Sequence, residues 1–229
     1  MSRPLAIAHR GASGREVENS LAAFRAAREL GADAVELDIH ATADGALMVH
    51  HDEKVGGFHL TRGTLKEARA LALGNGERVP TLEEALAVIA PDMIAFVEVK
   101  TLPPVWDQQL FAAIDRCPAP SRVHLHAFDH RIIRRLGATR PDIPRGVLSA
   151  SYPVRPERMM EDAGATALWE AAELIDAALV EDVHAKGGAI YPWTVDDPNQ
   201  MRHLLALGVD GLCSNHPDRA RAAIDSRNS

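Results

Sequence analysis

Short apolar runs alternate with longer amphipathic stretches along most of this chain. The apolar runs predict strands at residues 5–8, 34–39, 46–50, 94–99, 122–128, 146–149, 165–169, 189–195 and 209–214. The amphipathic stretches predict helices at residues 20–30, 82–89, 106–116, 130–139, 157–163, 175–186, 199–207 and 218–225. Strands that alternate with helices of this length indicate a parallel sheet.

Local signals mark where several of these helices begin and end. Thr81 and Glu84 have the spacing of a capping box, which predicts a helix start. Gly31 and Gly208 follow helical stretches in the position of a C-terminal cap. These signals support the order of strands and helices that the hydrophobic pattern predicts.

The number of strand–helix units separates two parallel architectures. With 46–50 as a hairpin arm, eight units remain in 229 residues, about 29 residues per unit. A doubly wound open sheet has fewer units and a glycine-rich phosphate loop, and the sequence contains neither G-x-G-x-x-G nor G-x-x-x-x-G-K-[ST]. We therefore predict an α/β fold, a (β/α)8 TIM barrel forming a single domain over 1–229. The glycine-rich segment 52–79 shows no clear strand and predicts a short excursion after the second strand.

Composition narrows the class of protein. A net charge of -7 gives no support to nucleic-acid binding, and no apolar run is long enough to span a membrane. The two cysteines, Cys117 and Cys213, are too few for a disulfide framework and lack zinc-site spacing. The N-terminal residues do not resemble a signal peptide, so we expect a cytoplasmic location.

Acidic residues gather where two neighbouring strands of the predicted barrel end. Glu36 and Asp38 are two residues apart on the second strand and share a face, and Glu98 ends the next barrel strand. Three carboxylates close together repel one another unless a cation neutralises them. Oxygen ligands favour Mg²⁺ or Ca²⁺ over zinc. The alternative is that the carboxylates only form salt bridges with Arg10 and Lys100.

Histidines and cationic residues surround this predicted cluster. His9 ends the first strand and His51 follows the hairpin arm, so both are placed for acid/base chemistry. His50 points away by alternation and is interpreted as structural, whereas His126 could equally belong to the core or to the site. Arg10 and Lys100 beside a cation would bind an anion, and phosphate is the natural candidate. This combination indicates metal-assisted hydrolysis of a phosphate ester.

A set of short motifs occurs in order along the chain. The first are His9-Arg10-Gly11, Glu18-Asn19-Ser20 with Phe24, Gly31-Ala32-Asp33, Glu36-x-Asp38, Thr42-x-Asp44-Gly45 and His51-Asp52. The later ones are Pro80-Thr81-Leu82-Glu83-Glu84, Glu98-x-Lys100, Ala127-Phe128-Asp129, Trp193-Thr194-Val195-Asp196-Asp197 and Gly208-Val209-Asp210-Gly211. From about residue 5 to residue 219, the combination resembles the glycerophosphodiester phosphodiesterase family.

The resemblance implies a barrel that hydrolyses glycerophosphodiesters to glycerol 3-phosphate and an alcohol. The implied metal ligands are Glu36, Asp38 and Glu98. The implied acid/base pair is His9 and His51. The implied substrate-binding residues are Arg10 and Lys100 at the phosphate and Trp193 as an aromatic wall. In the family, the glycerol hydroxyl is thought to attack phosphorus and give a cyclic phosphate, and the sequence leaves open which histidine acts first.

Three departures from the family pattern bear on specificity. The lid after His51 is shortened to 53–62, which leaves the alcohol group of the substrate open. His126 stands where a serine is common, and Asn215 follows Ser214 where Thr-Asp is usual. Two alternative functions are a lysophospholipase D, with Val55 and Phe58 contributing an apolar surface, and a non-catalytic phosphate-ester binding barrel. The oligomeric state is left open.

Overall fold

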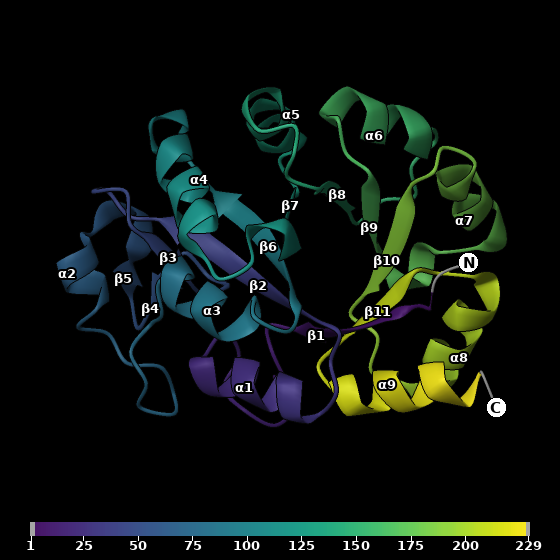
Figure 1. The fold of residues 1–229 in the computed structure, drawn as a ribbon, viewed down its shortest axis with the longest axis horizontal. Coiled ribbons are helices and arrows are strands. Elements are labelled where there is room, and N and C mark those ends of the chain that lie inside the picture. Colours follow the sequence, from purple (N-terminus) through teal and green to yellow (C-terminus); the bar gives the residue numbers. More distant parts are fainter. Residues whose placement is uncertain (1–2, 228–229) are drawn as a thin grey trace.

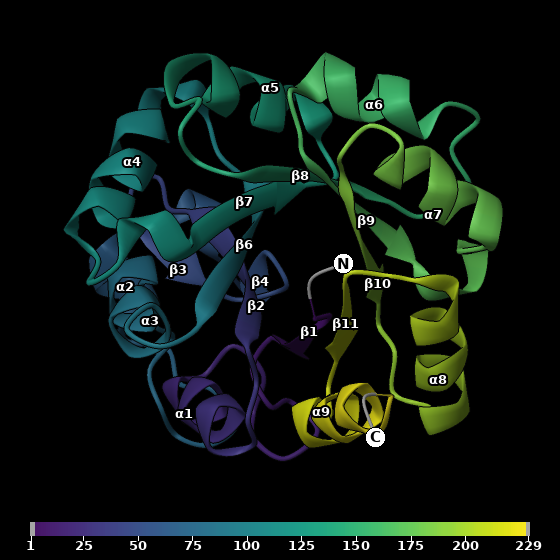
Figure 2. The same ribbon diagram turned by 45° about the vertical axis from the view of Figure 1, so that its right-hand side comes forward.

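Eight parallel strands form a nearly closed barrel with helices around it, in the fold class predicted from the sequence (Figures 1 and 2). The computed structural model describes residues 3–227, so the ends of the predicted 1–229 unit lie outside the described residues. The barrel strands are β1 (Leu5–His9), β2 (Ala34–Ala41), β6 (Ile94–Thr101), β7 (Val123–Ala127), β8 (Arg145–Ser149), β9 (Ala167–Ala171), β10 (Ala189–Trp193) and β11 (Gly211–Ser214).

The first and last strands of the chain close most of the barrel. β1 pairs with both β2 and β11, and Ile7 lies opposite Cys213 in the β1–β11 register. Between β10 and β11, hydrogen bonds from Asp210 N to Ile190 O (3.0 Å) and from Val195 N to Cys213 O (2.8 Å) bridge the seam. The first and last strands of the chain therefore lie side by side, as Figure 2 shows.

The predicted helices are all present, and no end is shifted by more than two residues. They are α1 (Leu21–Glu29), α3 (Leu82–Ile89), α4 (Asp107–Arg116), α5 (His130–Thr139), α6 (Pro156–Ala163), α7 (Ala177–His184), α8 (Pro198–Leu207) and α9 (Pro217–Ser226). The predicted capping box is formed, since Thr81 and Glu84 exchange side-chain and backbone hydrogen bonds. Gly208 ends α8 in the left-handed conformation. Helix boundaries thus follow local chemistry.

Single 3-10 turns connect several elements: η1 (Leu60–Arg62), η2 (Pro104–Trp106), η3 (Pro120–Arg122) and η4 (Ala172–Leu174). The predicted hairpin arm is also confirmed, because β3 (Leu47–Val49) pairs antiparallel with β2. This pairing continues the β2 ladder to Ala41, two residues beyond its predicted end. Both His40 and Ala41 gain partners in β3.

The prediction that segment 52–79 lacks strands is wrong. It contains the hairpin formed by β4 (Lys54–Val55) and β5 (Phe58–His59), as well as the short helix α2 (Leu65–Ala68). Gly56 and Gly57 both have positive φ, which allows the tight turn between the two strands. Two-residue strands carry too little hydrophobic pattern to be recognised in a sequence.

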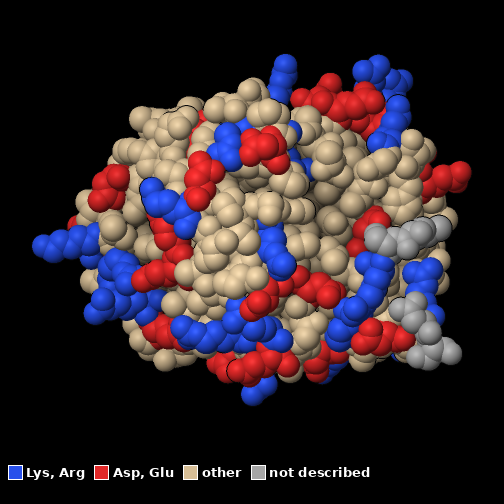
Figure 3. Space-filling model, viewed as in Figure 1, with Lys and Arg blue, Asp and Glu red and all other residues tan. Residues whose placement is uncertain are grey.

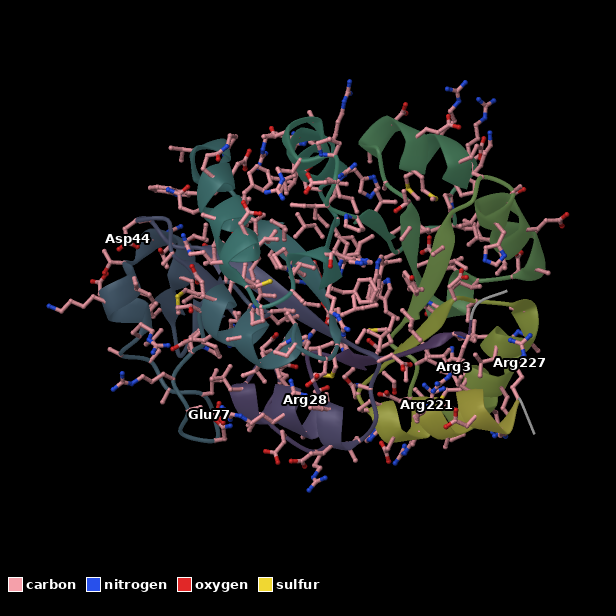
Figure 4. All side chains as sticks on the ribbon, in the orientation of Figure 1. Arg3, Arg28, Asp44, Glu77, Arg221 and Arg227 are labelled. Carbon is pink, nitrogen blue, oxygen red and sulfur yellow. The ribbon has the colours of Figure 1, made fainter. Side chains whose placement is uncertain are left out.

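Two acidic residues attach this excursion to the barrel (Figure 4). The Asp44 carboxylate accepts a hydrogen bond from Leu65 N at the start of α2 (3.0 Å). The Glu77 carboxylate accepts one from Leu21 N at the start of α1 (3.0 Å). The excursion is therefore attached to the rest of the chain near its middle, at Leu65, and near its end, at Glu77.

Side chains inside the barrel form two layers. The lower half, toward the amino ends of the strands, is an apolar cluster of Ile7, Ala34, Phe96, Leu148, Trp169, Tyr191 and Cys213. The upper half carries charged and polar side chains and is described below. A larger apolar cluster lies between the strands and the helices.

The surface carries mixed charge. Figure 3 shows Lys and Arg side chains interspersed with Asp and Glu on the face that it draws. Arg221 on α9 donates to the Asp33 carboxylate at the start of β2 (2.8 Å), which ties the last helix to the first strands (Figure 4). Among the described residues, no helix has the length and apolar character needed to cross a membrane.

Candidate active site

A cavity of about 60 Å³ opens at the carboxyl ends of the barrel strands. It is lined by His9, Arg10, Glu36, His51, Glu98, Lys100, His126, Phe128, Leu148, Trp169, Trp193 and Cys213. Seven of the eight site residues predicted from the sequence are among them. The exception is Asp38, which contacts two residues of the lining instead. In a parallel barrel, this edge is where catalytic residues are found.

The three predicted carboxylates do converge. Glu36 and Asp38 lie on β2, and Asp38 is opposite Glu98 in the register with β6. All three are buried, with at most 6% of each residue exposed. Strand alternation and the β2–β6 pairing together place three like charges at one height in the barrel.

Asp38 is held by cationic and amide groups. Its Oδ1 lies 3.1 Å from Lys100 Nζ, and its Oδ2 lies 3.3 Å from Arg10 Nε. The Asn19 side chain also donates to Oδ2 (2.8 Å). Burial acts to raise the pKa of Asp38, but Lys100 and Arg10 outweigh it and lower this pKa to about 2. Asp38 therefore stays ionised and anchors the two cations.

At Glu36 and Glu98, nearby positive charges do not offset the cost of burying a carboxylate. Burial, followed by repulsion from Asp38, raises the pKa of Glu36 to about 7 and that of Glu98 to about 8. Glu36 Oε2 accepts a hydrogen bond from Arg10 N (3.1 Å), and Glu98 Oε1 pairs with Lys100 Nζ (2.8 Å). One oxygen of each carboxylate is used in this way, so the other is available to a ligand.

His126 completes this buried group. One ligand atom each from Glu36, Glu98 and His126 lie within 4.8 Å of one another. Burial lowers the pKa of His126 to about 3, so its ring is neutral at physiological pH. Two buried carboxylates and a neutral imidazole have the donor chemistry to hold a divalent cation. The sequence prediction placed Asp38 rather than His126 in this set.

His9 is oriented by a chain of side chains from the carboxyl end of β11. The Asn215 Oδ1 atom lies 2.8 Å from His9 Nδ1, and Asn215 Nδ2 donates to Asp196 Oδ2 (2.7 Å). Ser13 Oγ donates to the same Asn215 oxygen (2.7 Å). An amide oxygen only accepts, so His9 carries its proton on Nδ1 and Nε2 is left for chemistry.

His51 has a different partner. Its Nδ1 lies 2.8 Å from the carboxylate of Asp52, which again leaves Nε2 for chemistry. His40 on β2 hydrogen-bonds the main-chain oxygen of His51 through Nε2 (3.0 Å) and fixes the backbone there. His50 instead bonds the Asp52 carbonyl and does not line the cavity, as its structural interpretation requires.

The turn after β1 adopts an unusual backbone to present Arg10. Arg10 and Asn19 both have positive φ, near 55° and 56°. Asn19 N donates to Arg10 O (2.9 Å), which holds the two together. Gly11 also has positive φ, and a Cβ there would lie 2.7 Å from the Cβ of Ala23. This turn directs the Arg10 side chain over Asp38.

An aromatic wall lies across the cavity from the carboxylates. Trp193, at the end of β10, lines the cavity as predicted, and Phe128 meets it edge to face with centroids 5.6 Å apart. Phe128 is 48% exposed, so this part of the wall faces solvent. The site thus has charged side chains from β1, β2 and β6 and aromatic side chains from β10 and from the residue that follows β7.

The sequence did not reveal the residues that position the predicted site residues. Asn19 enters the sequence analysis only as part of the motif Glu18-Asn19-Ser20, yet its side chain holds Asp38. Asn215 was noted as a departure, but no feature of the sequence pairs it with His9, 206 residues away. The one available signal was position, because both residues directly follow or precede a predicted strand or helix.

Sequence comparison identifies relatives of the whole chain. The model of the glycerophosphoryl diester phosphodiesterase family matches residues 9–219. A glycerophosphodiester phosphodiesterase of Caldanaerobacter subterraneus is 35% identical, covering 94% of this chain and 96% of the relative. A probable glycerophosphodiester phosphodiesterase 2 of Mycobacterium tuberculosis is 33% identical, covering 97% and 91%.

Comparison with solved structures finds proteins of the same kind. A glycerophosphodiester phosphodiesterase of Parabacteroides distasonis superposes with a TM-score of 0.88 at 27% identity, over 97% of both chains. An Oleispira antarctica phosphodiesterase, solved in complex with the product sn-glycerol-3-phosphate, superposes with a TM-score of 0.89 at 26% identity, over 96% of both. The chain belongs to the glycerophosphoryl diester phosphodiesterase family of enzymes.

Proposed function

We propose that this chain hydrolyses glycerophosphodiesters to glycerol 3-phosphate and an alcohol, using a divalent cation and two histidines. The observation that supports this most strongly is that His9, His51, Arg10 and Lys100 border one cavity with buried carboxylates. The product seen with the Oleispira relative is the one expected from this reaction.

The cation would be held by the carboxylates of the upper half of the barrel. Glu36 and Glu98 each have a free oxygen and a raised pKa, which fits a site that gains a positive charge. The predicted role of Asp38 as a ligand stays a prediction, because both of its oxygens contact other groups. When bound, the cation would stabilise negative charge that develops on the phosphate. Mg²⁺ and Ca²⁺ were the ions predicted from the oxygen ligands.

Arg10 and Lys100 are placed to bind the phosphate of the substrate. Both side chains line the cavity and are anchored by Asp38 beneath them. Charge from Asp38 and Glu98 outweighs the effect of burial on Lys100 and raises its pKa, which keeps the ammonium group charged. Trp193 and Phe128 would contact the apolar parts of the substrate.

The two histidines would move the protons. In the first step, a glycerol hydroxyl attacks phosphorus, one histidine accepts its proton, and the other donates a proton to the departing alkoxide. The products are the alcohol and a cyclic phosphate. Water then opens the cyclic phosphate with the roles reversed. The neutral partner Asn215 suits His9 as the first base, and the anionic partner Asp52 suits His51 as the first acid.

The structure gives less support to a lysophospholipase D. Val55 is buried, and Phe58 is partly buried against the same small cluster in the excursion. Neither residue forms the exposed apolar surface that this alternative needs. A binding barrel without catalysis is disfavoured because both histidines line the cavity with their Nδ1 atoms already partnered.

Release of glycerol 3-phosphate from glycerophosphocholine tests the proposal. The protein is treated with EDTA and assayed with a coupled dehydrogenase, before and after addition of Mg²⁺, Ca²⁺ or Mn²⁺. We expect release only after a cation is restored. Absence of release from folded protein with every cation would overturn the proposal, and lysophosphatidylcholine would then be assayed in the same way.

Two further expectations accompany this proposal. We propose that the whole chain acts as one domain, which the continuous apolar cluster from Ala6 to Ile224 supports. A cytoplasmic location stays a prediction from the sequence. The site supports a small-molecule glycerophosphodiester as a partner.

A further inference from the structure

His126 has an unsatisfied nitrogen in a buried position. It lies on β7 with its side chain 2% exposed, and its ring stacks on Trp169 with centroids 4.5 Å apart and planes 9° apart. Its Nδ1 atom has no hydrogen-bond partner. A buried polar atom without a partner costs about 1–3 kcal/mol, so its retention calls for an explanation. Stacking on Trp169 explains the plane of the ring but not the nitrogen, because a phenyl ring would stack as well.

The surroundings of the ring are carboxylate oxygens. His126 lies opposite Glu98 in the β6–β7 register, and its Nε2 is 3.8 Å from Glu36 Oε1. This is the Glu36 oxygen that the Arg10 backbone does not engage. The titratable and charged groups that face the ring are thus Glu36 and Asp38 from β2 and Glu98 and Lys100 from β6. The ring also lines the cavity.

The spacing suits a single ion. Ligand atoms from Glu36, Glu98 and His126 all lie within 4.8 Å of one another. Ions with ligand bonds of about 2.0–2.3 Å bring their ligand atoms to comparable separations. Asp38 is not in this group, and Lys100, Arg10 and Asn19 contact its two oxygens.

We propose that His126 is a nitrogen ligand of the divalent cation, so that this site selects a first-row transition ion such as Mn²⁺ over Ca²⁺. The inference rests on the proposed function for the presence of a cation. It differs in assigning a mixed nitrogen and oxygen donor set, whereas the three carboxylates alone indicate a hard ion. Imidazole binds transition ions well and Ca²⁺ poorly, so a nitrogen ligand from His126 changes the ion preference.

The experiment uses Mn²⁺ and Ca²⁺ with the full-length protein. Mn²⁺ binding is measured by calorimetry, and electron spin echo spectroscopy of the Mn²⁺ complex detects a directly bound ¹⁴N. The test variant is His126→Phe, which keeps a ring on Trp169 and removes both nitrogens. The matched control is His124→Phe, two residues away on the same strand, where the ring contacts Phe96 edge to face at 5.0 Å.

We expect a ¹⁴N signal in the wild type and in His124→Phe, and none in His126→Phe. Mn²⁺ affinity should fall by about 10–100-fold in His126→Phe, and Ca²⁺ affinity should change much less. The wild-type spectrum is informative even if His126→Phe does not fold. A Mn²⁺ complex without bound ¹⁴N, or a ¹⁴N signal that persists in folded His126→Phe, overturns the inference and leaves the proposed function intact. Failure of both ions to bind removes the cation from the proposed function as well.

Discussion

The lower and upper halves of the barrel interior come from the same strands and have opposite character. On β6, Phe96 belongs to the apolar lower half, while Glu98, two residues further on, belongs to the charged upper half. Phe96 contacts Trp169 and Tyr191 with centroids 4.9 and 5.4 Å apart. Glu98 instead lies near two other carboxylates. One strand thus contributes an aromatic ring that stabilises the fold and a buried carboxylate that destabilises it.

Burial of a side chain has opposite effects on stability in the two halves. In the lower half, burial of aromatic rings stabilises the fold, by about 1.5–3 kcal/mol for a large side chain. In the upper half, burial disfavours the ionised form of Glu36 and Glu98 and raises both pKa values. Without a cation, the ionised carboxylates of the upper half therefore destabilise the folded protein. Their position serves chemistry rather than stability.

The largest effect is expected from His51→Ala. Loss of one member of the acid/base pair should lower turnover of glycerophosphocholine by about 10²–10⁴-fold. Thermal unfolding should hardly change, because His51 belongs to the upper half and is partly exposed. The control is His50→Ala, which removes a neighbouring imidazole outside the cavity and should retain activity. Wild-type turnover in His51→Ala would remove this residue from the mechanism.

Phe96→Ala tests the lower half. It leaves a cavity among Trp169, Tyr191 and His124, and the free energy of unfolding should fall by about 3–5 kcal/mol. Phe96→Leu should cost less, because it leaves a smaller cavity. Urea denaturation followed by circular dichroism measures both. A loss below about 1 kcal/mol in Phe96→Ala would mean that the lower half does not carry the stability assigned to it.

Glu98→Gln tests the cost of charge in the upper half. The unfolded chain releases the Glu98 proton near pH 4.5, whereas the folded, metal-free protein holds it until about pH 8. Wild-type stability should therefore fall relative to Glu98→Gln, by about 3 kcal/mol between pH 5.5 and pH 8.5. Urea denaturation of both proteins in EDTA, at about pH 5.5 and 8.5, measures the difference. Parallel pH dependence of the two proteins would contradict the raised pKa.

The smallest effect is expected from Asn215→Ala. This change removes the hydrogen bond that orients His9, and a lost bond of about 1.4 kcal/mol corresponds to a roughly tenfold lower kcat. Asn215→Asp keeps an acceptor at the same place and should recover part of the rate. Unchanged kcat in Asn215→Ala, measured at saturating substrate, would show that His9 keeps its orientation without this residue.

Much of the fold and part of the site follow from short-range patterns. Alternating strand and helix patterns predicted the barrel, and the capping box at Thr81 and Glu84 formed as expected. Alternation along a strand correctly predicted that Glu36 and Asp38 share a face. The excursion was harder, because β4 and β5 depend on a turn at Gly56 and Gly57 rather than on periodicity.

The sequence by itself determined which residue types stand at the carboxyl end of each strand, since that depends only on local order and period. Tertiary structure alone decided which of them touch. Closure of the barrel brings Asn215 to His9 and His126 to Glu36, across 206 and 90 positions of the chain. Tertiary structure also decided how the three carboxylates differ. Both oxygens of Asp38 contact Lys100 or Arg10, whereas Glu36 and Glu98 each use one oxygen in this way. Distances of a few ångströms between distant residues set these interactions, and no local pattern encodes them.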